Sequence, residues 1–103
     1  MKTRKIKFAV NVVKWFDKIN GNTYHSVNIL DTRTGKRYVL PQVYTYGYGD
    51  SYKQSTIDIL LENKLIPAKY KDNLYLYDRE NNYPIEYNVI NGLKRDMKRN
   101  GTI

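Results

Sequence analysis

The segment 5–16 begins with a regular alternation of apolar and mostly polar side chains, which restricts the possible folds more strongly than any other pattern in the chain. Its apolar residues are two positions apart, which is typical of a strand with one buried face: Ile6, Phe8, Val10 and Val12. The alternation is lost at residues 13–16, where we expect a bulge or the end of the strand. The sequence therefore predicts that the fold begins with a β-sheet.

Two turn signals follow this strand. An Asn-Gly pair at residues 20–21 lies between apolar segments and is a strong hairpin signal, because both residue types tolerate positive φ. Residues 23–30 are predicted to return antiparallel, and a turn leads into a third strand over residues 37–46. Pro41 cannot donate a hydrogen bond to a neighbouring strand, so the third strand is predicted to be broken there or to lie at an edge.

The next segment, residues 51–65, has the spacing of an amphipathic helix. Ser51 and Gln54 fit a capping box at its start, and Pro67 ends it. Its apolar side chains should pack against those of the first strands. The predicted core contains Phe8, Val10, Val27, Ile29, Ile57, Leu60 and Leu61.

The last segments predict a hairpin and a short basic helix. Residues 74–77 and 83–90 are expected to be the paired strands of this hairpin, and residues 92–100 the helix. In this helix, Leu93 and Met97 are predicted to be buried, and Gly101 is predicted to be the C-terminal cap. The fold class is therefore α+β: an antiparallel β-meander with a packed helix, then a β-hairpin and a short C-terminal helix, in one domain over residues 1–103.

Positive charge is concentrated in two parts of the chain. Eighteen Lys and Arg residues oppose ten Asp and Glu residues, for a net charge of +8. Residues 1–49 carry +7, residues 50–90 carry −2 and residues 91–103 carry +3. Such segregation attracts polyanions, although a basic surface can also serve solubility alone.

Several classes of protein are disfavoured. The chain has no cysteine and one histidine, His25, so we expect a reducing compartment, no cofactor and no transition-metal site. Its apolar segments are too short to span a membrane, and no apolar segment of a signal peptide follows the basic N-terminus. Ser26, His25 and Asp17 could be written as a catalytic triad, but neighbours on one strand point to opposite faces. We expect a cytoplasmic protein that is not an enzyme.

Three segments are candidates for binding. Residues 14–25 surround the Asn-Gly turn with lysines and aromatic rings, which could contact phosphates and bases, or could lie in the core. Residues 44–50 hold two glycines before a helix, which could approach an anion or could only make the turn. Residues 94–99 place four cations on one helical face, which is either a binding face or a solvated one.

Residues 14–27 and 46–52 resemble small proteins of tailed bacteriophages, including crAss-like phages. The resemblance assigns no activity and no functional residues. It implies a phage product made in the cytoplasm of a bacterial host, where nucleic-acid binding, inhibition of a host factor and counter-defence are all reasonable functions.

The leading hypothesis is a non-enzymatic protein that binds DNA or RNA through phosphate contacts and aromatic stacking. The alternatives are an inhibitor that binds an acidic host enzyme or defence protein, and a minor structural or assembly protein of the virion. Pairing at a sheet edge would make a homodimer. The candidate nucleic-acid-binding residues are Lys5, Lys7, Lys14, Trp15, Lys18, Arg33, Lys36, Arg37, Tyr46, Tyr48, Lys94, Arg95, Lys98 and Arg99.

Overall fold

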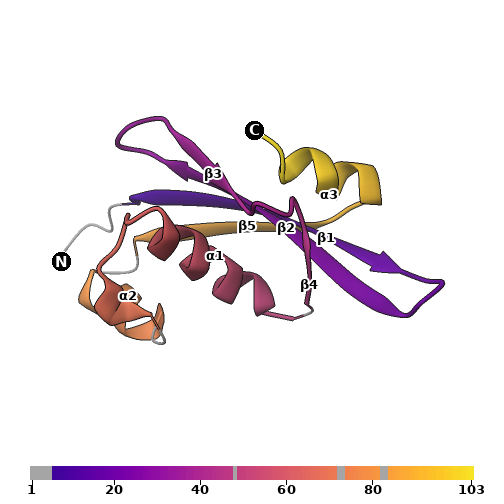
Figure 1. The fold of residues 1–103 in the computed structure, drawn as a ribbon, viewed down its shortest axis with the longest axis horizontal. Helices are drawn as coiled ribbons and strands as arrows, with labels where there is room; N and C mark the ends of the chain where they lie inside the picture. The colour runs from indigo at the N-terminus through magenta and orange to yellow at the C-terminus, as the bar shows by residue number, and fades with distance from the viewer. Residues whose placement is uncertain (1–5, 48, 72–73, 82–83) are drawn as a thin grey trace.

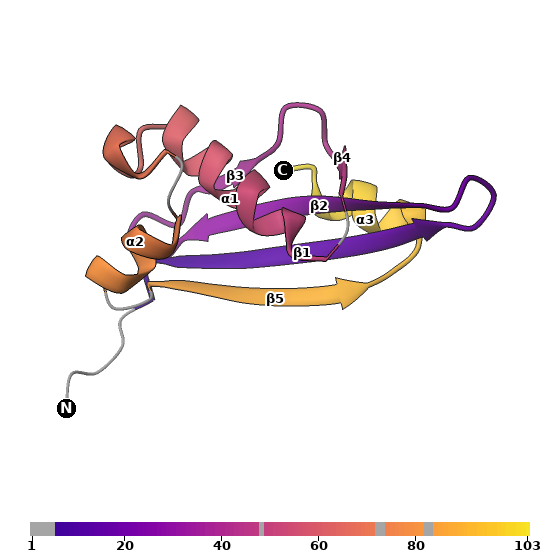
Figure 2. The same ribbon diagram turned by 90° about the horizontal axis from the view of Figure 1, so that it is seen from below.

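The structure is a computed structural model that describes residues 6–47, 49–71, 74–81 and 84–103. It has an α+β fold, as the sequence predicts, with one mixed sheet and helices on both of its faces (Figures 1 and 2). The strands are β1 (Phe8–Asp17), β2 (Asn22–Asp31), β3 (Arg37–Val39), β4 (Thr45–Tyr46) and β5 (Ile85–Asn91). The helices are α1 (Ser51–Glu62), the 3₁₀ turn η1 (Ala68–Tyr70), α2 (Leu74–Glu80) and α3 (Lys94–Asn100).

A long hairpin of β1 and β2 forms the centre of the sheet. The two strands pair without interruption from Phe8–Asp31 to Asp17–Asn22, so the predicted bulge or strand end at residues 13–16 is wrong. The alternation is lost there because the sheet is covered on both faces: Val13 is buried on the face that α3 covers. Buried strands of this kind show apolar residues on both faces.

The turn of this hairpin depends on one glycine. Gly21 has φ 68° and donates its amide to the Asp17 carbonyl oxygen at 2.8 Å, and Asn20 keeps negative φ. The Asp17 carboxylate accepts hydrogen bonds from the backbone amides of Ile19 and Asn20. The hairpin that the sequence predicts is therefore present, but its loop has more residues than the Asn-Gly pair alone.

The third strand is interrupted near Pro41, as predicted. Its two pieces, β3 and β4, both pair antiparallel with β2. The sheet order is β3-β2-β1-β5, with β4 also on β2.

The second predicted hairpin is wrong. The segment 74–77 belongs to the helix α2, and β5 pairs parallel with β1, from Phe8–Ile85 to Lys14–Asn91. A four-residue alternation of Leu and Tyr also fits a single helical turn. Tertiary contacts favour the helix, because Tyr77 is buried with its ring 5.1 Å from that of Tyr70, and the Tyr70 hydroxyl donates to Glu80 at 2.6 Å.

The two faces of the sheet carry different helices. Figure 1 shows α1 and α2 on one side of the sheet and α3 on the other, above only part of it. The apolar core lies under α1, and the predicted core is confirmed except for Leu61, which is only partly buried. Its members from the prediction are Phe8, Val10, Val27, Ile29, Ile57 and Leu60.

The ends of α1 differ from the prediction. Asp50 is the N-cap residue, and the Gln54 side chain donates to Asp58 at 2.9 Å, so the predicted capping box of Ser51 and Gln54 is wrong. The helix ends at Glu62, before the predicted limit of residue 65, because Lys64 takes a left-handed conformation with φ 57°. That conformation ends the helical hydrogen bonding.

Helix α3 is short and is anchored by one apolar side chain. Met97 is fully buried, whereas Leu93, which was predicted to face inward, precedes the helix as its N-cap and is 55% exposed. Gly101 ends the helix with an ordinary φ of −81°. Glycine is needed there for space, because a Cβ atom would overlap the carbonyl oxygen of Val43.

Candidate nucleic-acid interface

The predicted basic residues divide between the two ends of the β1–β2 hairpin. Nine residue steps of β1 separate these ends by about 30 Å. Lys7, Arg33, Lys36 and Arg37 lie near the β2–β3 turn, while Lys18 and α3 lie near the β1–β2 turn or the half of the sheet beside it. The predicted residues Lys5 and Tyr48 lie outside the described residues. Among the described residues, the predicted cations therefore lie in two groups and not in one continuous surface.

At the β2–β3 turn, two of the arginines make internal contacts. Arg33 Nε donates to the buried Asp31 carboxylate at 3.2 Å, and its guanidinium lies 5.4 Å from the ring centre of Phe8. Burial raises the pKa of Asp31, but the hydrogen bonds and charge of Arg33 outweigh it, so the net shift is downward. Arg37 Nη1 donates to Asn28 Oδ1 at 3.1 Å. Lys36 stays exposed.

Lys14 faces α1 and is used inside the fold. Its Nζ donates to the Gly49 carbonyl oxygen at 2.7 Å and lies 5.2 Å from the ring centre of Tyr52. The loop that contains Gly47 and Gly49 therefore binds a cation through a carbonyl oxygen. This contact favours the interpretation of residues 44–50 as a strand-to-helix turn over that of an anion site.

His25 belongs to the same internal network. Its Nε2 lies 2.7 Å from the Ser55 hydroxyl oxygen, and its Nδ1 lies 3.4 Å from the Gly47 carbonyl oxygen. Burial lowers the pKa of His25, and the charge of Lys14 lowers it further, against an opposite effect of the Gly47 carbonyl. Both His25 and Ser55 are buried, so the pair connects β2 to α1 out of reach of a bulky substrate. Ser26 lies on the other face, where Asn100 donates to its hydroxyl.

Aromatic rings gather beside α3. Register places Tyr46 opposite Tyr24, and Tyr24 opposite Trp15. The Trp15 and Tyr24 rings stack at 5.7 Å, and Tyr46 meets Tyr24 edge to face at 5.8 Å. Trp15 also carries Lys94 Nζ at 5.3 Å from its ring centre. We call Tyr46, Tyr24 and Trp15 the aromatic row; Tyr46 is its accessible member, at 57% exposed.

Four exposed cations stand on α3: Lys94, Arg95, Lys98 and Arg99. The helix is held by Met97 and by Asn100, whose Nδ2 donates to the Asn11 carbonyl and to Ser26 Oγ, both at 3.0 Å. In the described part of the chain no salt bridge engages Arg95, Lys98 or Arg99. Lys94 lies close enough to Asp17 to help lower the pKa of that carboxyl, after the larger effect of the Asn20 side-chain hydrogen bond. Arg95, Lys98 and Arg99 therefore stand on an anchored helix without a carboxylate that neutralises them among the described residues.

The end of the hairpin belongs to residues 14–25, a predicted binding segment, but the apolar groove beside it was not predicted. Phe16, Ile19 and Leu93 are strongly exposed and line a groove of about 770 Å³ along the edge of β1, beyond the last residue of β5. Figure 2 shows the hairpin extending past β5. The ring of Phe16 is among those that the sequence offers either for stacking or for the core, and its exposure places it outside the core.

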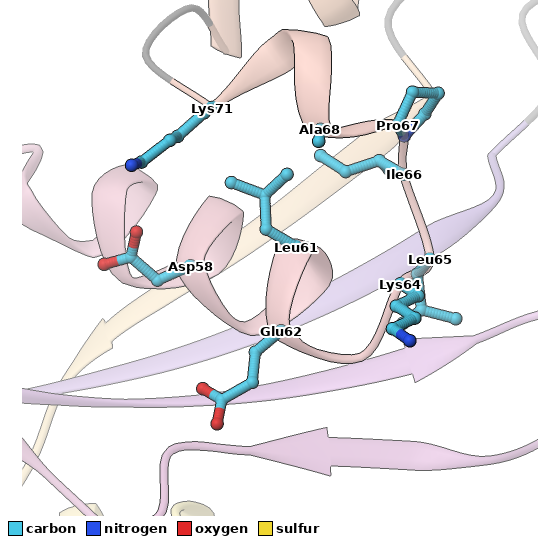
Figure 3. A pocket seen from close by; sticks show the side chains of 9 residues that line it. All are labelled: Asp58, Leu61, Glu62, Lys64, Leu65, Ile66, Pro67, Ala68 and Lys71. Carbon is cyan, nitrogen blue, oxygen red and sulfur yellow. The ribbon is translucent and has the colours of Figure 1, made fainter.

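A second groove lies on the α1 side of the molecule (Figure 3). It has a volume of about 870 Å³, and Leu61, Ile66 and Ala68 point into it between α1 and η1. Asp58 and Lys71 stand at one side of it. Leu61 also packs against the core, so the floor of this groove is the outer layer of the core. None of the predicted binding residues lines it.

The residues that the structure describes contain no group of three or more His, Cys, Asp or Glu residues that could hold a metal ion. They also contain no helix of the length and apolar character that crossing a bilayer requires.

The chain was compared with known proteins in three ways. No protein-family model, no curated protein and no solved structure matches it.

Proposed function

We propose that this protein binds nucleic acid without catalysing a reaction, through the cations of α3 and the aromatic row. The observation that carries the proposal is the state of Arg95, Lys98 and Arg99, which are exposed on a helix anchored to the sheet and engage in no salt bridge among the described residues. Phosphate groups neutralise such cations and release counterions.

The aromatic row supports the same proposal. Tyr46 offers an accessible ring at the end of the row, and bases of any sequence stack on such rings. Trp15 contributes indirectly, because its ring already contacts Tyr24 and Lys94 and so positions the start of α3. The proposed surface is smaller than the full set predicted from the sequence, since Lys14 and Arg33 make internal contacts.

A matched pair of charge variants tests the proposal. We expect Arg95→Gln with Arg99→Gln to weaken binding of labelled DNA and RNA oligonucleotides, and to reduce the slope of log affinity against log salt by about one for each lost phosphate contact. The control is Lys53→Gln with Lys71→Gln, which removes the same charge on the α1 side. Fluorescence anisotropy at several salt concentrations measures both.

Two results would contradict the proposal. One is an equal loss of affinity in both double variants, which would mean that only net charge matters. The other is no binding by the parent protein at about 10⁻⁴ M, the weak end of ordinary non-specific affinity.

Binding of a protein partner is a second candidate function, favoured by the exposed apolar side chains of Phe16, Ile19 and Leu93 along the open edge of β1. Contiguous exposed apolar residues often mark interaction sites. A partner recovered from a bacterial lysate after nuclease treatment, in stoichiometric amount, and lost with Ile19→Asp would support this candidate. Recovery that depends on nucleic acid would argue against it.

A further inference from the structure

Helix α3 leaves half of its sheet face open. The helix covers the half nearer the β1–β2 turn, where Asn100 reaches Ser26 and the carbonyl oxygen of Asn11. Register continues this face away from α3 in two rows of side chains. They are Val39, Asn28, Asn11 and Asn88, then Arg37, Leu30, Ala9 and Glu86. We call these two rows the open face; in Figure 1, none of the helices in the described part of the chain lies over that part of the sheet on the α3 side.

Asparagines cross three strands in the first row. Asn11 is opposite Asn28 in β2 and opposite Asn88 in β5. The Asn28 amide is already engaged, since it donates to the Asn100 carbonyl at 2.9 Å and accepts from Arg37. Asn11 and Asn88 are exposed, and within the described part of the chain neither side-chain amide makes a hydrogen bond. Each therefore offers a donor and an acceptor side by side.

The chemistry of such amides fits the edges of nucleobases. A carboxamide can donate and accept at once, as a base edge requires, and sequence-specific RNA recognition uses unstacked bases in this way. The unstacked bases of a single strand leave these edges free to meet a broad sheet surface, so the ligand that we assign to this face is single-stranded. The half-buried Ala9 and Leu30 beside the row form a low apolar surface against which a base can lie.

Charge around the open face suits a phosphate backbone. Arg37 is at one border, and Arg99 and Asn100 of α3 are at the other, where Asn100 contacts both Asn11 and Asn28. Glu86 is the only carboxylate among the side chains of the two rows. A chain of phosphates can therefore follow the cations of α3 while its bases turn toward the sheet.

We infer that a single-stranded nucleic acid lies across the open face, with its phosphates along α3 and its bases against Asn11 and Asn88. The inference rests on the proposed function, and it adds a floor that contacts base edges to a surface that otherwise contacts phosphates through α3 and stacks bases on Tyr46. Because the amides contact bases and the cations contact phosphates, the amides should affect the preference between bases and the cations should affect the salt dependence of binding.

Substitution of the two exposed asparagines tests whether the open face contacts bases. Asn11→Ala with Asn88→Ala should weaken binding of the preferred single-stranded homopolymer about tenfold, and should reduce the difference between homopolymers of different bases. The salt slope should stay unchanged, because no phosphate contact is lost. Thermal unfolding of the same variant checks that it stays folded.

A charge variant gives a second, independent readout. Asn11→Glu adds a carboxylate to the floor and should lower affinity by at least about tenfold, since like charges repel the phosphate backbone. The control is Gln42→Glu, an exposed residue outside the two rows that lines a groove with α1; it should change affinity about twofold or less. In an NMR titration with oligonucleotide, the amide signals of Asn11 and Asn88 should move, together with those of α3.

The outcomes distinguish failure of the inference alone from failure of the proposed function. If the Gln variants of α3 weaken binding while the variants of Asn11 and Asn88 bind like the parent, the floor is refuted and the phosphate-binding function stands. If no oligonucleotide binds, both fall. If the Asn11 and Asn88 signals move with protein concentration alone, a second copy of the chain occupies the open face, which also overturns the inference.

Discussion

On the face of the sheet under α1, Phe8, Val10 and Ile29 are at most 1% exposed, whereas on the opposite face α3 is held by Met97 and by a set of polar contacts. The first face excludes water completely along the centre of both long strands. The second face is covered at one end and open at the other. One sheet therefore carries two surfaces of different composition.

The difference separates stability from binding. Burial of apolar area stabilises a fold by about 25 cal/mol per Å², while a hydrogen bond contributes only about 0.5–1.5 kcal/mol net. The α1 face should therefore provide most of the free energy of folding. The α3 face can keep exposed cations and unpaired amides because little of the stability depends on it.

The largest expected effect is at the core. Leu60→Ala on α1 should lower the free energy of unfolding by about 2–5 kcal/mol, because it leaves a cavity beneath a fully buried side chain. Urea unfolding followed by circular dichroism measures the loss. A decrease below about 0.5 kcal/mol would show that the α1 face does not carry the stability.

A smaller effect is expected at the end of α3, where Gly101 packs against Val43. Gly101→Ala should cost about 1–3 kcal/mol, because its φ suits any residue but the added Cβ would overlap the Val43 carbonyl oxygen. Ile103→Ala, at an exposed position two residues later, is the control. Amide hydrogen exchange should accelerate in α3 before it does in α1. Uniform acceleration would mean that the two faces unfold as one unit.

The pH dependence of the free energy of unfolding should reflect the burial of His25 against α1. Burial lowers the pKa of His25 in the folded protein, so between that pKa and the ordinary value of 6.5 the unfolded chain binds more protons. Stability should be fully present above pH 6.5 and should fall as the pH drops below it, with a slope of at most about 1.4 kcal/mol per pH unit for one proton. His25→Gln should remove this slope below about pH 6.5. An unchanged slope in the variant would assign it to other groups.

The smallest effect is expected on the open face. Asn11→Ala should change the free energy of unfolding by no more than about 0.5 kcal/mol, since its side chain is exposed and makes no hydrogen bond within the described residues. Chemical unfolding beside the Leu60→Ala variant gives the direct contrast. A loss comparable to that of Leu60→Ala would show that both faces stabilise the fold equally.

Short-range patterns predicted the elements whose evidence is local. The strands β1 and β2 follow from residue alternation and from the Asn-Gly turn, and α1 follows from helical spacing. The exposed cations of α3 also follow from spacing, although their role in binding stays a prediction. The predicted capping box at Ser51 was wrong. Its residue types also occur inside the first turn of helices, and here Asp50, one residue earlier, is the N-cap of α1.

The open face shows what local patterns do not contain. Asn11, Asn28 and Asn88 form one row only because three strands pair in a particular register, and Ile85 of β5 pairs with Phe8, which is 77 positions earlier. The inward direction of Lys14 depends in the same way on the distant carbonyl group of Gly49. No window of neighbouring residues carries that information.

Local patterns were enough to predict the α+β class, the first hairpin, the main helix and most of the core, because backbone preferences and side-chain periodicity act over a few residues. The helical state of residues 74–80, the parallel pairing of β5 with β1 and the position of α3 on the face opposite α1 depend instead on tertiary contacts. These choices depend on which distant surfaces can be buried together, and a parallel pair requires a long crossover whose direction no local signal specifies.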